Sequence, residues 1–292
     1  MTQRVLVTGG GGFVGRHVVA DLTARADAEV IVVMHRWENR RTLDEVVGPG
    51  VVHRCIHLGW YADPADYLTA SEGNIDSLQR SLELADWLGG RSCRHLTVAG
   101  TCAEYAPLSR PMVETDEVAP WSAYGATKAS FRMMLSSSFC PPGIEVAWAR
   151  LFNLTGPGES PMRLIPLVVL ALLRGHDVAL LPGRQVRDYL DVADVASALV
   201  DLSTTKASGA FNVSSAEGME LCQLLGRIGD RLGRRELLRF GSRPYGPHDA
   251  PLVVGDNSSL RRVTSWKRRY DTEAMIDRVI EYWKRSETRD PS

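Results

Sequence analysis

The sequence lacks an excess of charge of either sign, since 34 lysines and arginines stand against 35 aspartates and glutamates, for a net charge of −1. Nucleic acids and anionic membranes attract proteins through clustered basic charge, so we expect neither as a partner. The sequence also lacks a long apolar run. The longest, residues 164–173, is interrupted by Pro166 and is too short to cross a bilayer.

Paired cysteine motifs are absent as well. The five cysteines are an odd number and include no CxxC pair, the spacing typical of zinc sites and redox-active disulfides. We therefore expect reduced thiols and no metal site. The first residues are polar and lead directly into a strand pattern, unlike a signal peptide. Together these features predict a cytoplasmic protein.

Strand and helix patterns alternate through the first half of the chain. Short apolar or β-branched runs predict strands at 4–7, 29–34, 51–58, 94–99 and 144–150. Helical spacing is found over 17–26, 74–88 and 124–139. Such alternation predicts an α/β fold, a Rossmann-type doubly wound parallel sheet with helices on both faces.

A glycine-rich loop, TGGGGFVG at residues 8–15, follows the first predicted strand and opens a helix. Glycine permits a tight turn and lets the backbone approach a pyrophosphate, which the helix N-terminus then binds. In this context the motif predicts dinucleotide binding, although a strand-to-helix turn without a ligand is the alternative. The predicted contacts are Gly9, Gly12, Phe13, Val14 and Gly15.

The second half is less regular, with proline and glycine breaks at 156–161, 182–183 and 241–251, and it ends in an amphipathic helix at 273–285. We expect residues 1–150 to form the NAD(P)-binding domain and 151–292 to form mainly a smaller C-terminal substrate-binding portion. Because 188–202 has helical character, part of about 188–215 is expected to return to the first domain.

No acidic residue stands directly at the end of the second predicted strand, where one would bind the ribose hydroxyls of NAD. His35 and Arg36 stand there, and the first acid is Glu38. Arginine suits a 2′-phosphate because its charge and planar fork match that group. The sequence thus favours NADPH over NAD, with His35 and Arg36 as contacts. A solvated basic loop is the alternative.

Tyr124 and Lys128 lie four residues apart in YGATK, and a helix would place them on one face. A nearby ammonium favours the phenolate and lowers a tyrosine pKa. Such a tyrosine can exchange a proton with an alcohol oxygen near neutral pH. On its own, a tyrosine and a lysine at this spacing are common by chance and usually have a structural role. The pair gains specificity beside the glycine loop and Thr101, which ends an intervening strand pattern.

With these motifs, the sequence resembles the extended short-chain dehydrogenase/reductase family. This is the nucleotide-sugar epimerase, dehydratase and ketoreductase group, and within it the chain is similar to 4-ketoreductases of nucleotide-linked 4-keto-6-deoxyhexoses. The resemblance covers nearly the whole chain. The segments that carry it are TGGGGFVG, CIHLGWYADP, SEGNIDSL, GTCAEY, YGATK, RLFNLTGPGE and RQVRDYLDVADVA.

The resemblance implies roles for three residues in the reaction. Tyr124 would be the acid/base. Lys128 would bind the nicotinamide ribose and lower the pKa of Tyr124. Thr101 matches a residue that hydrogen-bonds the reacting oxygen.

Further contacts are implied at both ligands. Leu58 and Asn74 would lie at the cofactor. Asn153 would lie near the diphosphate of a nucleotide-sugar substrate, and Arg187 would bind it, as is physically reasonable for a guanidinium. The family also implies a homodimer through helices at 74–88 and 124–139.

Departures from the family pattern select the reaction. Dehydratases of this group carry acids where this chain has Cys102 and Ala103, and 3,5-epimerases need a second acid/base that we do not find. We interpret Cys102 as a packing residue. The missing acid after the second predicted strand then favours NADPH-dependent reduction of a 4-keto group on a nucleotide-linked sugar. The resemblance to deoxysugar reductases implies a dTDP- or CDP-linked 4-keto-6-deoxyhexose, with dTDP favoured.

Two alternatives remain. One is an NAD-dependent nucleotide-sugar 4-epimerase, which needs the same three residues. The other is a non-catalytic NADP-binding regulator, although such proteins typically lose the tyrosine or the lysine.

Three further departures are Trp60, Tyr61 and Glu104. The first two stand where the family usually has small residues, and either aromatic could wall the sugar pocket. Glu104 could hydrogen-bond a sugar hydroxyl, although on a strand it would point to the face opposite Ala103. Core packing is the alternative for all three.

Overall fold

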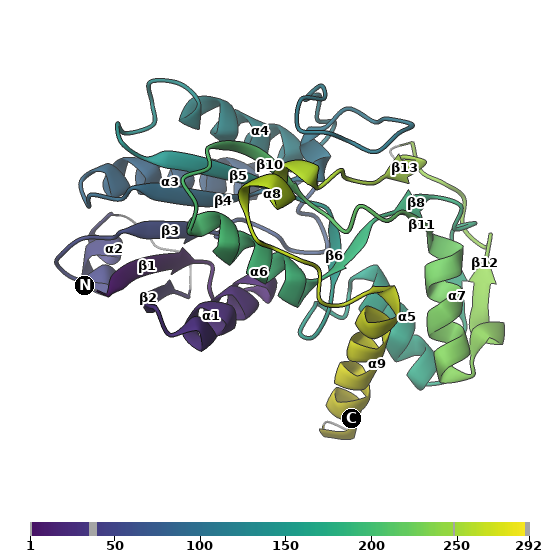
Figure 1. Ribbon diagram of the computed structural model, residues 1–292. Coiled ribbons are helices and arrows are strands. Elements are labelled where there is room, and N and C mark those ends of the chain that lie inside the picture. The colour runs from purple at the N-terminus through teal and green to yellow at the C-terminus, as the bar shows by residue number, and fades with distance from the viewer. Residues whose placement is uncertain (1, 35–39, 248, 290–292) are drawn as a thin grey trace.

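The computed structural model describes residues 2–34, 40–247 and 249–289. A six-stranded sheet forms its centre (Figure 1), and its order is β10-β5-β4-β3-β1-β2 with every neighbouring pair parallel. Its strands are β1 (Gln3–Thr8), β2 (Ala28–Val33), β3 (Arg54–His57), β4 (His95–Thr101), β5 (Glu145–Leu151) and β10 (Gly209–Val213). β3 and β4 are buried along their whole length, as expected for a parallel sheet covered on both faces.

Helices cover both faces of this sheet. α1 (Phe13–Arg25) and α6 (Val192–Ser203) pack on one face, and α2 (Arg40–Val47), α3 (Ser71–Gly89) and α4 (Ala123–Leu135) on the other. Alternate residues of β1 enter the two cores, Val5 and Val7 on one side and Leu6 on the other, because strand side chains alternate between faces. The predicted doubly wound α/β fold is confirmed.

The rest of the second half builds a third apolar core beyond the sheet (Figure 1). It contains α5 (Leu164–Leu173), α7 (Leu221–Leu232) and α9 (Thr272–Arg289), with β7 (Val178–Leu180) paired to β12 (Leu238–Phe240). Short pairs join it to the sheet: β6 (Asn153–Thr155) with β9 (Tyr189–Asp191), and β8 (Val186–Arg187) between β11 (Met219–Glu220) and β13 (Leu252–Val253). The remaining elements are α8 (Ser258–Val263) and the 3-10 turns η1 (Cys102–Glu104) and η2 (Arg235–Leu237).

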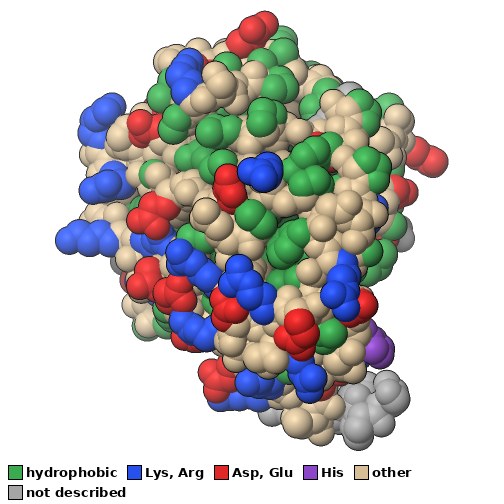
Figure 2. Space-filling model, turned by 90° about the vertical axis from the view of Figure 1, so that its right-hand side faces the viewer, with side chains coloured by type: hydrophobic (Ala, Val, Ile, Leu, Met, Phe, Trp, Pro, Cys, Tyr) green, Lys and Arg blue, Asp and Glu red, His purple; other side chains and the backbone are tan. Residues whose placement is uncertain are grey.

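The surface of this second half carries charges of both signs. Figure 2 shows basic and acidic side chains beside one another over its lower part. The ion pairs Arg239–Asp177, at 3.1 Å, and Arg235–Asp230, at 2.5 Å, are of this kind. Within the described ranges, no helix combines the length and the apolar character that a membrane span requires.

One predicted helix begins later than its sequence pattern indicates. Residues 189–191 of the segment 188–202 form β9, and α6 starts only at Val192. The carboxylate of Asp191 accepts a hydrogen bond from the Ala193 amide at 2.8 Å. Asp191 is therefore the N-cap that ends the strand and starts the helix.

The carboxyl ends of the sheet strands point toward the second half (Figure 1). Because the chain places β2 on one side of β1 and β3 on the other, a crevice opens between the loops that follow β1 and β3. At the base of this crevice the two loops touch at Gly9, which has φ +69°. Only glycine fits there, since a Cβ would lie 2.8 Å from the Gly59 amide nitrogen. The fold thus brings the glycine loop against the loop that contains Trp60.

Candidate functional site

A cavity of about 910 Å³ lies at this crevice, within the size range typical of ligand pockets. Its walls come from both halves of the chain: the glycine loop, the segment after β3, the end of β4, the start of α4, and residues 151–164 with Tyr189. One ligand-sized space therefore joins the sheet edge to the second half.

The predicted cofactor contacts in the glycine loop all line this cavity, and so does Leu58. The loop is held by a hydrogen bond from the Gly12 amide to the Gly9 carbonyl at 3.0 Å. α1 then begins at Phe13, and no side chain caps it. Its first amides are free of intrahelical partners, which is the arrangement that binds phosphate. The predicted 2′-phosphate contacts His35 and Arg36 lie outside the described residues.

Thr101, Tyr124 and Lys128 meet in the cavity. Thr101 is the last residue of β4, and the other two lie in the first turns of α4, which the Ser122 hydroxyl caps by accepting from the Gly125 amide at 3.1 Å. The Thr101 side chain favours the ionised form of the Tyr124 phenol and in this way opposes the rise in its pKa. The strand end and the helix start thus bring together the three residues that the sequence singled out.

The pKa of Tyr124 differs in direction from the sequence prediction. Burial raises the pKa of this phenol above its ordinary value, Tyr67 adds to the rise, and the Thr101 side chain opposes it. The sequence predicts that the Lys128 ammonium lowers this pKa. In the structure desolvation dominates, and Tyr124 is a neutral phenol that can donate a proton.

Lys128 is buried between strand and aromatic groups. Its Nζ donates to the Ala99 carbonyl at 2.6 Å and lies 4.0 Å from the centre of the Trp60 ring. The Tyr124 ring centre is 5.9 Å away. Burial lowers the pKa of Lys128 to about 7, so its charge is poised to change near neutral pH.

Trp60 and Tyr61 both line the cavity. The Trp60 indole donates to the Asn74 side-chain oxygen at 2.9 Å, and the Tyr61 hydroxyl donates to Asp66 at 2.7 Å. The two aromatics are therefore placed as wall residues. Trp60 is in addition the surface against which the Lys128 ammonium packs.

The structure does not place Asn74 against the cavity, contrary to the predicted cofactor contact. Its amide nitrogen donates to the carbonyls of Tyr67 and Ala70 at 2.7 and 2.8 Å, and its oxygen accepts from Trp60. The side chain is fully buried. Asn74 thus supports the cavity wall.

Glu104 is also placed differently from the prediction. Residues 102–104 form η1 instead of continuing the strand, and the Glu104 carboxylate turns inward, 0% exposed. It accepts hydrogen bonds from the Thr101 amide, the Trp148 indole and the Arg150 guanidinium, at 2.9, 2.9 and 2.8 Å. It cannot contact a sugar hydroxyl, because three protein donors surround it away from the cavity.

Cys102, in the same turn, does line the cavity. Burial raises the pKa of its thiol to about 12. The thiol is therefore neutral at physiological pH and is a poor acid or base.

The two predicted diphosphate contacts differ in position. Asn153, in β6, lines the cavity, and its amide donates to the Asp188 carbonyl at 3.3 Å. Arg187, in β8, is not among the residues that line it, and its guanidinium donates to the Val186 carbonyl at 3.0 Å. Of these two residues, Asn153 is thus the one positioned to contact a ligand in this cavity.

Tyr67, Glu159 and Arg163 are among the lining residues that were not predicted from the sequence. The Tyr67 ring stands edge-on to Tyr124 with centres 5.1 Å apart, and the Arg163 guanidinium lies 4.4 Å from the centre of the Tyr67 ring. Glu159 accepts from the Thr155 hydroxyl at 2.5 Å, and burial raises its pKa to about 7.

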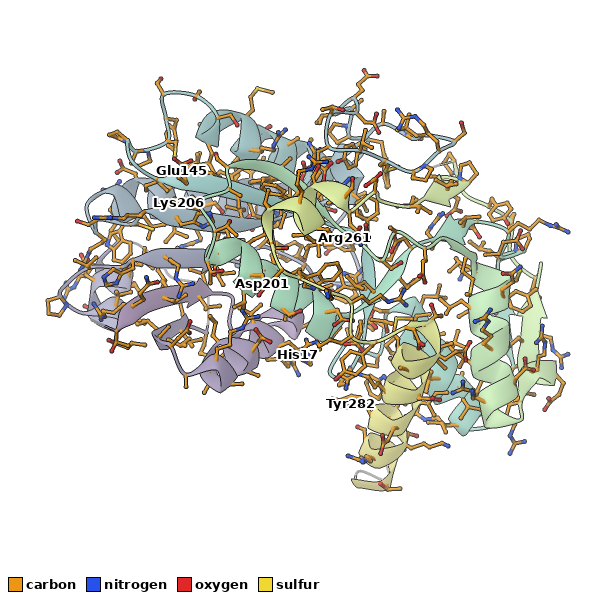
Figure 3. The ribbon with its side chains drawn as sticks, in the orientation of Figure 1. His17, Glu145, Asp201, Lys206, Arg261 and Tyr282 are labelled. Carbon is orange, nitrogen blue, oxygen red and sulfur yellow. The ribbon has the colours of Figure 1, made fainter. Side chains whose placement is uncertain are left out.

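Sequence signals for these residues are weak. Glu159 lies within the motif RLFNLTGPGE, so its place in a site segment could have been inferred, whereas Tyr67 lies in an aperiodic turn. His17 of α1, labelled in Figure 3, hydrogen-bonds the Pro157 carbonyl at 2.9 Å and fixes this motif against the first half.

Comparison with known proteins gives matches over almost the full chain. UDP-glucose 4-epimerase of Lacticaseibacillus casei is 24% identical, covering 95% of this chain and 94% of that protein. UDP-glucuronic acid decarboxylase 1 of Arabidopsis thaliana is 26% identical, covering 95% of this chain and 69% of that protein.

Solved structures agree with this likeness at the level of the fold. The UDP-glucose 4-epimerase of Thermotoga maritima superposes with a TM-score of 0.84 at 22% identity, covering 97% of this chain and 99% of that one. RMD from Pseudomonas aeruginosa, complexed with NADPH, gives 0.81 at 23% identity, covering 97% and 100%. The model of the NAD dependent epimerase/dehydratase family matches residues 5–214. The chain therefore belongs to the NAD dependent epimerase/dehydratase family.

Proposed function

We propose that the protein reduces the 4-keto group of a nucleotide-linked 4-keto-6-deoxyhexose, with dTDP as the favoured nucleotide and NADPH as the hydride donor. The observation that supports this most strongly is the meeting of Thr101, Tyr124 and Lys128 beside the glycine loop in one cavity. The hydride adds to the carbonyl carbon, and the oxygen takes a proton from Tyr124. The products are an alcohol and NADP⁺.

The protonation states suit reduction. Burial raises the pKa of Tyr124 and keeps its phenol neutral. Tyr124 therefore carries the proton that the product needs. Thr101, which lines the same cavity, can donate to the same carbonyl oxygen. The Lys128 ammonium stabilises the phenolate left after proton transfer, in a site where low dielectric strengthens the attraction.

The residues after Thr101 argue against water elimination. Burial raises the pKa of the Cys102 thiol to about 12, so this thiol keeps its proton at physiological pH. Ala103 has no ionisable group. Neither supplies the acid and base that expulsion of water demands.

A 4-epimerase is the second candidate, favoured by the curated relative from Lacticaseibacillus casei, which carries that activity. An epimerase returns the hydride to the sugar and retains its cofactor. The basic residues His35 and Arg36 and the lack of an acid after β2 favour an exchangeable NADPH. A cofactor-binding regulator is disfavoured because Thr101, Tyr124 and Lys128 are all present.

The proposal is tested by mixing the protein with a dTDP-4-keto-6-deoxyhexose and NADPH and following nicotinamide absorbance. We expect NADPH oxidation that Tyr124→Phe abolishes while cofactor affinity is kept. Absence of oxidation, with NAD co-purified and UDP-glucose converted to its 4-epimer, would establish the epimerase. Cofactor binding with neither reaction would establish the regulator.

A further inference from the structure

A fully buried ion pair lies directly behind the candidate catalytic residues. The Arg150 Nε and the Glu104 carboxylate are 2.8 Å apart, and both side chains are 0% exposed. The same carboxylate accepts from the Thr101 amide and the Trp148 indole. The turn is closed from the other side, where the Thr101 hydroxyl accepts from the Ala103 amide at 3.2 Å. Glu104 therefore fixes the backbone of Thr101, and the Ala103 amide of the same turn holds the Thr101 hydroxyl.

Two glycines show how closely the turn packs against its neighbours. A Cβ on Gly100 would lie 2.2 Å from the Trp148 indole nitrogen and 2.8 Å from the Glu104 carboxylate. A Cβ on Gly125 would lie 2.3 Å from the Ala103 carbonyl oxygen. The end of β4, the turn η1 and the start of α4 thus interlock without room for a side chain.

The same strand end connects the carboxylate to Lys128. The Lys128 ammonium donates to the carbonyl of Ala99, and the next residue, Gly100, abuts the Glu104 carboxylate. The negative charge of Glu104 raises the pKa of Lys128 and opposes the larger lowering by burial.

The other ionisable groups near Lys128 do not supply a negative charge. On its own helix, Tyr124 is neutral because burial raises its pKa. On β3, His57 is neutral because burial lowers its pKa to about 3, and Lys128 itself contributes to that lowering. On β5, Arg150 is positive. Among these described groups Glu104 is the anion.

Stability does not account well for such a pair. Replacing a buried ion pair by apolar residues of similar size is often neutral or stabilising. A local role at the site gives a reason for it.

We infer that Glu104 is a positioning residue, whose buried carboxylate orients Thr101 and keeps Lys128 in its ammonium form. This inference rests on the proposed function, in which Thr101 and Lys128 act. It assigns to Glu104 a role through these two residues and no contact with substrate or cofactor.

The test exploits the scarcity of lysine, since the chain has four: Lys128, Lys206, Lys267 and Lys284. The side-chain nitrogens are labelled with ¹⁵N and titrated by NMR, with and without NADPH, and Lys128→Met assigns the signal. In Glu104→Gln the amide oxygen can still accept from Thr101, but the charge is gone. Removing the anion should lower the pH at the midpoint of the Lys128 titration. At pH 7 we expect about fivefold less charged Lys128, which corresponds to roughly one pH unit.

Controls separate this effect from misfolding. Glu104→Gln leaves Arg150 unpaired and could unfold the chain, so Glu104→Gln/Arg150→Met removes both charges, and the Lys128 midpoint should again fall. Glu114→Gln is the matched control. Its carboxylate accepts from the Asn212 amide at 2.8 Å, outside the cavity lining, and we expect no change at Lys128.

A folded Glu104→Gln or double variant that titrates like the wild type at Lys128 would overturn the inference. Because no keto-sugar is used, this outcome is independent of the proposed function. If the wild type proves to be a reductase, the pH at which its activity is lost should shift downward in Glu104→Gln and return in Glu104→Asp.

Discussion

At the scale of single residues, the site depends on how burial sets protonation. The sequence identified Thr101, Tyr124 and Lys128 because their types and spacing are informative. It could not give the direction of the Tyr124 pKa, because that depends first on burial in the folded chain and then on neighbours such as Tyr67, distant in the sequence. Proximity to Lys128 was the visible signal, and burial proved to be the larger effect.

The Lys128 pKa gives a prediction for activity. Since burial lowers that pKa to about 7, the ammonium is present below this pH and is lost as pH rises through it. If the ammonium stabilises the Tyr124 phenolate, kcat for NADPH oxidation falls as pH increases past about 7. A pH–rate profile at saturating NADPH measures this. A kcat that stays level well above neutral pH would show that Lys128 remains charged or is not needed.

At the scale of elements, most of the periodic segments were predicted, whereas α2, β10 and several element ends were not. The strands and helices around the sheet have clear apolar periods. The turn at 102–104 was missed, although TCAE carries the threonine and glutamate of a capping box, which the structure contains. The capping-box residues are visible in the sequence, but the apolar run before them favours a strand that continues through this segment. Asp191 was passed over in the same way within 188–202.

The start of α1 gives an element-scale prediction. A Cβ on Gly15 would lie 2.0 Å from the Gly9 carbonyl oxygen, so Gly15→Ala should push the helix away from the glycine loop. We expect a loss of about 1–3 kcal/mol in the free energy of unfolding and at least tenfold weaker NADPH binding.

Gly90→Ala is the matched control for that substitution. Gly90 has φ −73°, and the Trp87 carbonyl oxygen would be 3.5 Å from the new Cβ, so stability should hold or rise by up to about 1 kcal/mol. Chemical denaturation and cofactor titration measure both variants. Equal effects of the two would contradict the close approach at Gly15.

At the scale of the whole molecule, we propose a cytoplasmic homodimer that pairs the outer faces of α3 and α4. Ile75 on α3 and Met133 on α4 are 50% and 72% exposed, although both are large and apolar, and α3 packs beside α4. We expect a partner to cover these two side chains in the dimer.

Met133→Glu should then shift the protein toward monomer in sedimentation velocity, because a charge would be buried without a partner. Met162→Glu is a comparison at an exposed apolar residue of the second half, 61% exposed, and should leave the dimer intact. A wild type that is monomeric at all concentrations would contradict the proposal.

The central claim concerns hydride transfer from an exchangeable cofactor to a sugar carbon, and it is tested directly with NADPH deuterated at the transferred position. After incubation with a dTDP-4-keto-6-deoxyhexose, we predict one deuterium at carbon 4 of the sugar for each NADPH consumed, and none with Tyr124→Phe. A product without deuterium, or turnover that leaves NADPH unconsumed while a bound NAD is retained, would contradict it.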